Sequence, residues 1–99
     1  MDIQIQSIHF KADQKLITFT EEKLGKLKQY FDGILAAEVF LRLDKSDDTT
    51  NKLVEIKLMV PGNELYVEKQ CKSFEEAVDL CCEALTKQVK KYKEKKIGI

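Results

Sequence analysis

The stretch KLVEIKLMVPGNELYVEKQC, residues 52–71, alternates apolar and polar side chains on both sides of a Pro-Gly pair. Alternate residues of a strand share one face, so one face of this segment is apolar and the other is polar. Pro61 and Gly62 suit the two central positions of a type II turn. The pattern therefore predicts two antiparallel strands whose single apolar face must be buried against a second layer.

Two earlier segments show the same alternation. Residues 2–10, DIQIQSIHF, and residues 37–43, AEVFLRL, each carry apolar side chains mainly at every second position. Both read as half-buried strands. The three strands between residues 37 and 71 are expected to form an antiparallel meander.

A helical period appears between the first two strands. Behind a candidate N-cap at Asp13, apolar residues recur every three or four positions as far as Phe31. This spacing predicts an amphipathic helix of about five turns. Gly25 lies inside it, and because glycine weakens a helix we expect this residue to mark close packing against another backbone. Gly33 is expected to end the helix in a left-handed conformation.

A second helix is predicted over residues 74–96. Ser73 and Glu76 have the S-x-x-E spacing of a capping box. At 1.5 Å per residue the helix would be about 34 Å long, which is more than short strands need, so its last turns should project beyond the core. Its apolar stripe consists of Phe74, Ala77, Val78, Cys81, Leu85, Val89 and Tyr92.

The element order βαβββα predicts an α+β fold, a four-stranded sheet with both helices packed on one face. All 99 residues are expected to form a single domain. The other face of the sheet should be mostly solvated, and its candidate residues are Phe40, Glu55, Lys57, Tyr66 and Glu68.

The sequence offers no signal for a membrane or for export. No stretch approaches the ~20 apolar residues of a membrane span, and residues 1–10 lack the basic start and apolar core of a signal peptide. We therefore expect a cytosolic protein with no membrane partner. The three cysteines agree with this expectation, because Cys81 and Cys82 are adjacent on a helix and do not suit a disulfide. Together with Cys71 they should be free thiols that pack as small hydrophobic side chains.

Motifs that would carry catalysis are weak. His9 is the only histidine, and its spacing suggests no partner for acid–base chemistry or zinc binding. The four glycines form no phosphate-binding loop, and the cysteine pair lacks C-x-x-C spacing. The acidic run SDD, residues 46–48, is not followed by the glycine of a calcium loop. We expect no enzyme activity, catalytic residue, metal, cofactor or small-molecule substrate.

Charge is unevenly distributed along a chain that is neutral overall. The 17 basic and 17 acidic residues cancel, yet residues 87–96 hold six lysines and one glutamate. Cations at a helix C-terminus complement the helix dipole, but six over three turns repel one another, which favours a polyanion-binding ridge over a merely solvated face. Lys87, Lys91 and Lys95 would form one row, with Lys90 adjacent and Lys93 and Lys96 flanking it.

A smaller basic cluster lies on the first predicted helix. Lys23 and Lys26 are three residues apart and point away from the apolar stripe. If both helices cover the same sheet face, this pair and the row of the last helix could border one groove. Such a surface suits the phosphates of structured RNA, whereas the sheet lacks the aromatic pattern that stacks single-stranded bases.

The chain resembles the ribosome hibernation promoting factors and ribosome-associated translation inhibitors, once called sigma-54 modulation proteins. The resemblance spans almost the whole chain and is strongest in EKLGKLKQYFDGI, residues 22–34, and SFEEAVDLCCEALTKQVKKYKEK, residues 73–95; VPGNELYVEKQ fits between them. The family fold is βαβββα, similar to double-stranded RNA-binding domains with an added first strand. Gly33 departs from the family pattern, which often has arginine there.

The resemblance implies binding to 16S rRNA of the small ribosomal subunit, in the channel of mRNA and tRNA, and inhibition of translation in stationary phase or stress. The family's basic residues match Lys23, Lys26, Lys87, Lys91, Lys93 and Lys95, and Lys90 adds charge at a variable position. Because the sequence ends at Ile99, we expect a short member without a second domain. Whether it promotes or prevents 100S ribosome dimers stays open. The alternative is a protein-interaction module whose basic last helix docks an acidic protein.

Overall fold

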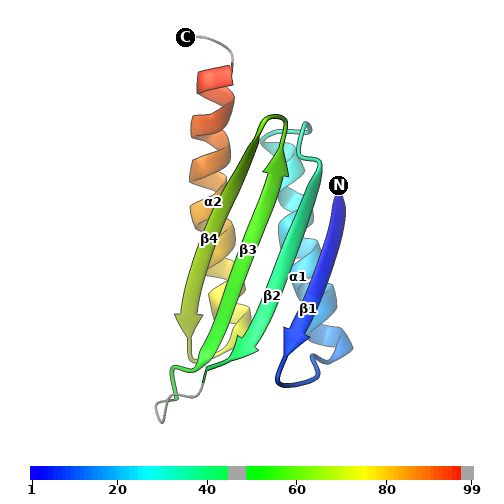
Figure 1. Cartoon of the computed structure of the whole chain (residues 1–99), viewed down its shortest axis with the longest axis vertical. Coiled ribbons are helices and arrows are strands. Elements are labelled where there is room, and N and C mark those ends of the chain that lie inside the picture. Colours follow the sequence, from blue (N-terminus) through cyan, green and yellow to red (C-terminus); the bar gives the residue numbers. More distant parts are fainter. Residues whose placement is uncertain (45–48, 97–99) are drawn as a thin grey trace.

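The computed structural model describes residues 1–44 and 49–96. The elements follow the predicted order βαβββα, with one short 3₁₀ helix, η1, added (Figure 1). They are β1 (Asp2–Ile8), α1 (Gln14–Gly25), η1 (Lys26–Gln29), β2 (Ala36–Leu43), β3 (Lys52–Val60), β4 (Asn63–Cys71) and α2 (Phe74–Lys96).

The four strands form one sheet in the order β1-β2-β3-β4. The predicted meander is confirmed, since β2 pairs antiparallel with β3, and β3 with β4. Strand β1 pairs parallel with β2, because α1 carries the chain back across the sheet between them. Both helices lie behind the sheet in the view of Figure 1, so they cover one face, as the two apolar patterns require.

The core lies between the sheet and the two helices. Alternate residues of β2 and β3, such as Val39 and Ile56, are fully buried and belong to one core cluster with the apolar stripe of α2. That stripe was predicted correctly over most of its length, since its buried members include Val78, Leu85 and Val89. Burial of apolar area is the main force that holds the layers together, at roughly 25 cal/mol per Å² removed from water.

Both predicted N-caps are confirmed. The Asp13 carboxylate accepts a hydrogen bond from the backbone N–H of Leu16 at 2.9 Å. The Ser73 hydroxyl accepts one from the backbone N–H of Glu76 at 3.1 Å. Each bond satisfies a donor that has no partner within its own helix.

The first helix is shorter than predicted. Its α-helical bonding ends at Gly25, and the chain continues as η1, where the Tyr30 N–H donates to the carbonyl of Leu27 at 3.0 Å. Glycine is a weak helix former, and 3₁₀ turns are common at helix ends. The expected contact of Gly25 with another backbone is also wrong, because no atom beyond its chain neighbours and its own helix backbone lies within 4 Å of where its Cβ would be.

Two turn positions differ from the prediction and one agrees. Gly62 has a φ of 75°, as the type II turn requires. Gly33 is not left-handed; instead the Phe31 ring lies against it, and an added Cβ would approach that ring within 2.8 to 2.9 Å of its two ε carbons. His9 takes a φ of 69°, so β1 ends at Ile8 rather than at Phe10.

The outer sheet face carries the polar alternates of the strands, as expected. Lys57 pairs in register with Tyr66, and Phe40 with Glu55, which in turn neighbours Glu68. Tyr66 is 44% exposed and donates a hydrogen bond to the Glu68 carboxylate at 2.9 Å. Phe40, Glu55 and Lys57 are only half-buried.

Two predictions from the sequence concern residues that the structure does not describe. The acidic run of residues 46–48 and the side chain of Lys96 lie outside the described residues. Over the ranges 1–44 and 49–96, no helix combines the length and apolar character needed to cross a membrane.

Candidate nucleic-acid interface

The basic half of α2 is held in place by contacts near its end. Val89 is fully buried against the core. Tyr92 donates its hydroxyl hydrogen to the carbonyl of Pro61 at the β3–β4 turn, and its ring packs on Phe31 with centroids 5.5 Å apart. Beyond that turn the last turns of α2 extend past the sheet (Figure 1). The prediction of a projecting helix end is therefore confirmed.

The lysines of α2 occupy two sides of the helix. Lys91 and Lys95 line a shallow hollow beside the β3–β4 turn, next to Gln88 and Asn63. Gln88 itself reaches β4, where its amide donates to the carbonyl of Tyr66 at 3.0 Å. Lys87 is exposed. This side of α2 therefore presents the predicted row of Lys87, Lys91 and Lys95.

Lys90 and Lys93 lie on the other side, toward η1. The ammonium of Lys90 lies over the ring of Tyr30, 5.0 Å from its centroid. The ammonium of Lys93 donates to the backbone carbonyl of Tyr30 at 3.4 Å. Within residues 1–44 and 49–96, no carboxylate forms an ion pair with any α2 lysine whose side chain is described. Their charge is therefore available to an external anion.

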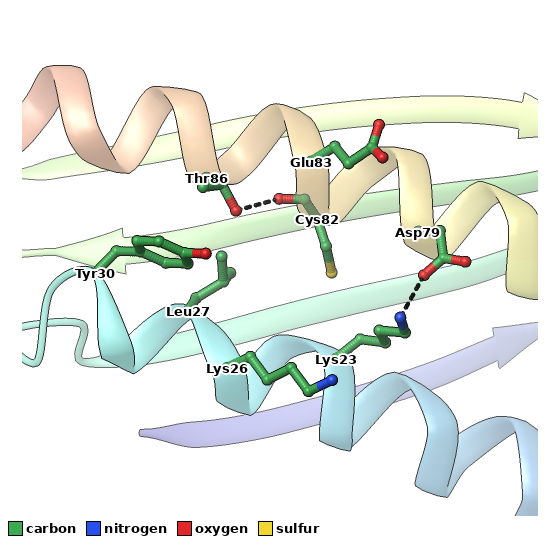
Figure 2. Close-up of a pocket in the computed structure, with 8 residues that line it drawn as sticks. All are labelled: Lys23, Lys26, Leu27, Tyr30, Asp79, Cys82, Glu83 and Thr86. Atoms are coloured by element: carbon green, nitrogen blue, oxygen red, sulfur yellow. Dashed lines mark hydrogen bonds and ion pairs between the residues drawn. The ribbon is translucent and has the colours of Figure 1, made fainter.

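A groove separates α1 and η1 from α2 (Figure 2). Its volume is about 210 Å³. At one end the ammonium of Lys23 forms an ion pair with the Asp79 carboxylate at 3.0 Å and lies 5.5 Å from the centre of the Phe19 ring. The hydrogen bond to Asp79, more than its charge, raises the pKa of Lys23. The groove is lined by Lys23, Lys26, Leu27, Tyr30, Asp79, Cys82, Glu83 and Thr86.

The groove corrects one expectation. It exists between the helices and contains Lys23 and Lys26, but α2 contributes Asp79, Cys82, Glu83 and Thr86 to it, not the row of Lys87, Lys91 and Lys95. The reason is the period of α2, because the row lies on the far side of the helix from α1. The α2 lysines that reach the groove are Lys90 and Lys93, through their contacts with Tyr30.

The structure thus distinguishes seven candidate lysines by environment. Lys26, Lys87, Lys90, Lys91, Lys93 and Lys95 are exposed, whereas Lys23 is half-buried and paired with Asp79. The positions of six therefore suit phosphate binding directly. Lys23 would first have to leave Asp79.

Sequence reasoning missed two features of this surface. Tyr30 lies between the lysines of η1 and those of α2. Its one distinguishing mark in the sequence is that it is an aromatic residue next to Phe31 and outside the apolar stripe of the helix. Lys28 was also overlooked, although it lines a hollow with Tyr30 and Lys93 on the outer side of η1. Its ammonium lies near the α-amino group of Met1, and a hydrogen bond donated by Lys28 to the neutral form of that amine is the chief cause that lowers its pKa.

Burial keeps the thiols of Cys81 and Cys82 from being activated as nucleophiles. Burial raises the pKa of the Cys81 thiol to about 12 and that of Cys82 to about 11. Thiols with such pKa values are protonated at neutral pH, and the thiolate is the nucleophilic form. Cys71 is free and buried as well. Across the described part of the chain, no three His, Cys, Asp or Glu side chains come together in an arrangement that could hold a metal.

Comparisons with known proteins place the chain in a family. It is 30% identical over 95 residues to the ribosome hibernation promoting factor of Pseudomonas putida. The matched region covers 96% of this chain and 89% of that protein. The structure superposes on a ribosomal subunit interface protein from Coxiella burnetii with a TM-score of 0.84 at 23% identity, over 95% of this chain and 99% of the other.

A second solved structure agrees. The N-terminal domain of Protein Y from Thermus thermophilus matches with a TM-score of 0.81 at 28% identity, over 93% of this chain and 99% of that domain. The family described as sigma 54 modulation protein / S30EA ribosomal protein matches residues 3–97. The chain therefore belongs to the sigma 54 modulation protein / S30EA ribosomal protein family.

Proposed function

We propose that this protein is a ribosome hibernation factor that binds the small ribosomal subunit in the channel of mRNA and tRNA and inhibits translation in stationary phase or stress. Family membership supports the association with ribosomes, and the relative from Pseudomonas putida carries that function in its name. The lysines of η1 and α2 support RNA as the contacted component.

The observation that carries the proposal is the unpaired charge on the end of α2. Five lysines, Lys87, Lys90, Lys91, Lys93 and Lys95, are exposed on a helix whose position is fixed by Val89 and Tyr92. Like charges this close repel one another, so the arrangement costs stability unless an anion binds. Because the helix backbone is already ordered, only the lysine side chains lose freedom when they bind a run of phosphates.

The mechanism is steric rather than catalytic. The lysines of α2, with Lys26 and Lys23 of the neighbouring segment, bind phosphates of 16S rRNA, and the body of the domain occupies the space that mRNA and tRNA need. Such contacts provide affinity and orientation but read no base sequence. Release of counterions makes the binding salt-dependent, with a slope of log K against log salt of roughly −4 to −5 for six phosphates.

Sedimentation with purified small subunits tests the proposal. The protein should co-sediment with the subunit, and added tRNA or mRNA should displace it, since all three occupy the same channel. Inhibition of a translation assay should be relieved by the same competitors. Binding that neither competitor affects would overturn the proposed location.

Treatment with RNase separates this proposal from docking to an acidic protein. Digestion of ribosomal RNA should abolish capture if the lysines bind phosphates, whereas an acidic protein partner would remain bound. Sedimentation of 70S ribosomes mixed with the protein reports whether they accumulate as 100S dimers.

A further inference from the structure

Tyr30 is an exposed aromatic side chain in the middle of a cluster of lysines. Its exposed fraction is 39%, and it lies outside the core, whereas its neighbour Phe31 packs against the core and Tyr92. Burial therefore does not account for an aromatic ring at this position. The ring forms part of the groove between α1 and α2, at the opposite end from the Lys23–Asp79 pair (Figure 2).

Four lysines surround Tyr30. Lys90 lies over the ring and Lys93 donates to the Tyr30 carbonyl, as described above. Lys26 lines the groove on one side of the tyrosine, and Lys28 lines the hollow on its other side. The hollow has a volume of about 390 Å³ and is more polar than the groove. A partly exposed aromatic ring between two cation-lined depressions is a combination suited to a nucleobase with its flanking phosphates.

Carboxylates limit where a nucleic-acid backbone can run. Glu83 and Asp79 lie farther along the groove, and Asp32 lies in the hollow. These acids repel phosphates, so the favourable path crosses Tyr30 between them, over Lys26, Lys90 and Lys93. The path is short, which suits one base and its neighbouring phosphates rather than a long duplex.

In the free protein Lys90 covers a face of the ring. An ammonium over an exposed aromatic ring is held only weakly. A phosphate beside the bound base offers the same ammonium a charge-assisted hydrogen bond, which is the stronger interaction. Lys90 can therefore leave the ring when a nucleotide arrives, and the base takes its place.

Building on the proposed function, we propose that Tyr30 is a stacking site for one unpaired nucleobase of RNA, with Lys26, Lys90 and Lys93 holding the adjacent phosphates. The chemical class of ligand is a single-stranded or bulged nucleotide within a structured RNA. Stacking on Tyr30 makes the affinity for RNA depend on the presence of a base, whereas the lysines recognise only phosphate.

A pair of fluorescein-labelled RNA hairpins tests the inference by fluorescence anisotropy. One hairpin carries a bulged adenosine, and the other carries an abasic ribose at the same place, so their phosphates are equal in number. The wild-type protein should bind the adenosine hairpin roughly 5- to 150-fold more tightly. Equal affinity for the two hairpins, or binding to neither, would overturn the inference.

Three variants identify the contact. Tyr30→Leu should remove the preference for adenosine while both hairpins still bind, whereas Tyr30→Phe should keep it because the ring remains. Lys87→Gln should weaken both hairpins equally, since Lys87 lies outside the Tyr30 cluster. Retention of the preference in Tyr30→Leu would refute stacking on this residue, and circular dichroism checks that each variant is folded.

The same proteins separate this inference from the proposed function. If Tyr30 does not stack a base, Tyr30→Leu and the wild type will bind small subunits equally and with the same salt dependence. If the proposed function fails, the wild type will not sediment with small subunits, while the preference for the adenosine hairpin persists.

Discussion

The two halves of α2 differ in both charge and burial. Residues 74–86 hold four carboxylates and no lysine, and residues 87–96 hold six lysines and one glutamate. The first half packs its apolar stripe on the sheet through Ala77, Val78, Cys81 and Leu85, all fully buried. The second half has few core contacts, chiefly those of Val89 and Tyr92.

This difference separates stability from binding within one helix. Acidic residues near the N-terminus and basic residues near the C-terminus both suit the helix dipole, which accounts for the direction of the gradient. The dipole acts mainly within the first and last turns, so it does not account for lysines over the whole second half. We infer that the first half of α2 holds the fold and that the second half binds an anionic partner.

The largest expected effect is on stability and lies in the first half. Leu85→Ala removes a fully buried side chain and should lower the free energy of unfolding by about 2–5 kcal/mol. Urea denaturation followed by circular dichroism measures it. Leu80→Ala is the matched control, because Leu80 is on the same half but 38% exposed, and it should cost well under half as much. Equal losses of unfolding free energy in the two variants would contradict the inference that the buried stripe of this half holds the fold.

Loss of charge from the second half should affect binding instead. A variant with Lys87, Lys90, Lys91 and Lys93 all changed to Gln should bind small subunits about 100-fold more weakly, at about 0.7 kcal/mol for each exposed pair lost. Its stability should be unchanged or slightly higher, since repulsion is relieved.

A control for that variant comes from lysines elsewhere. Lys15, Lys69 and Lys72 are exposed and lie away from η1 and from the second half of α2. Changing all three to Gln should leave subunit affinity within about threefold, because distant exposed charges are screened by salt. A similar loss in both variants would mean that net charge, rather than this surface, governs binding.

The contact that fixes the second half is open to a subtler test. Tyr92→Phe removes the hydrogen bond to Pro61 but keeps the ring that packs on Phe31. We expect a loss of about 1 kcal/mol in the free energy of unfolding and faster amide exchange in residues 90–96. Tyr66→Phe, which removes a hydroxyl bonded to Glu68 on the exposed sheet face, should change neither.

The smallest effect concerns the acid in the groove. Asp79→Asn releases Lys23 from its ion pair and should tighten subunit binding by about two- to fourfold, because exposed ion pairs are weak. Filter binding at constant salt is precise enough to detect it. Glu75→Gln makes the same change of charge in the first turn of α2 and should have less effect. Weaker binding by Asp79→Asn would mean that the pair itself orders the surface.

Much of the fold was predictable because its patterns are local. The alternation in residues 52–71 predicted the hairpin, and Ser73 and Asp13 predicted both helix starts. The early end of α1 was not predicted, since Leu24, Leu27 and Phe31 keep the same spacing through η1. The left-handed conformation of His9 was not predicted either, because few residues other than glycine adopt it, even though histidine does so more often than most.

The candidate site was predictable in its lysines but not in its geometry. The period of α2 placed Lys87, Lys91 and Lys95 in one row, yet the position of α1 relative to that row depends on tertiary packing. The contacts of Lys23 with Asp79 and of Lys90 with Tyr30 join residues far apart in the sequence. No sequence motif predicts either pair, because the packing of the helices is what brings the two members of each pair together.

The salt dependence of small-subunit binding tests the central claim most directly. For the wild type, log K against log salt should fall with a slope of roughly −4 to −5, and for the variant with four lysines changed to Gln the slope should shrink by about three. The variant at Lys15, Lys69 and Lys72 should keep the wild-type slope. An equal slope for the four-lysine variant and the wild type would contradict binding through the second half of α2.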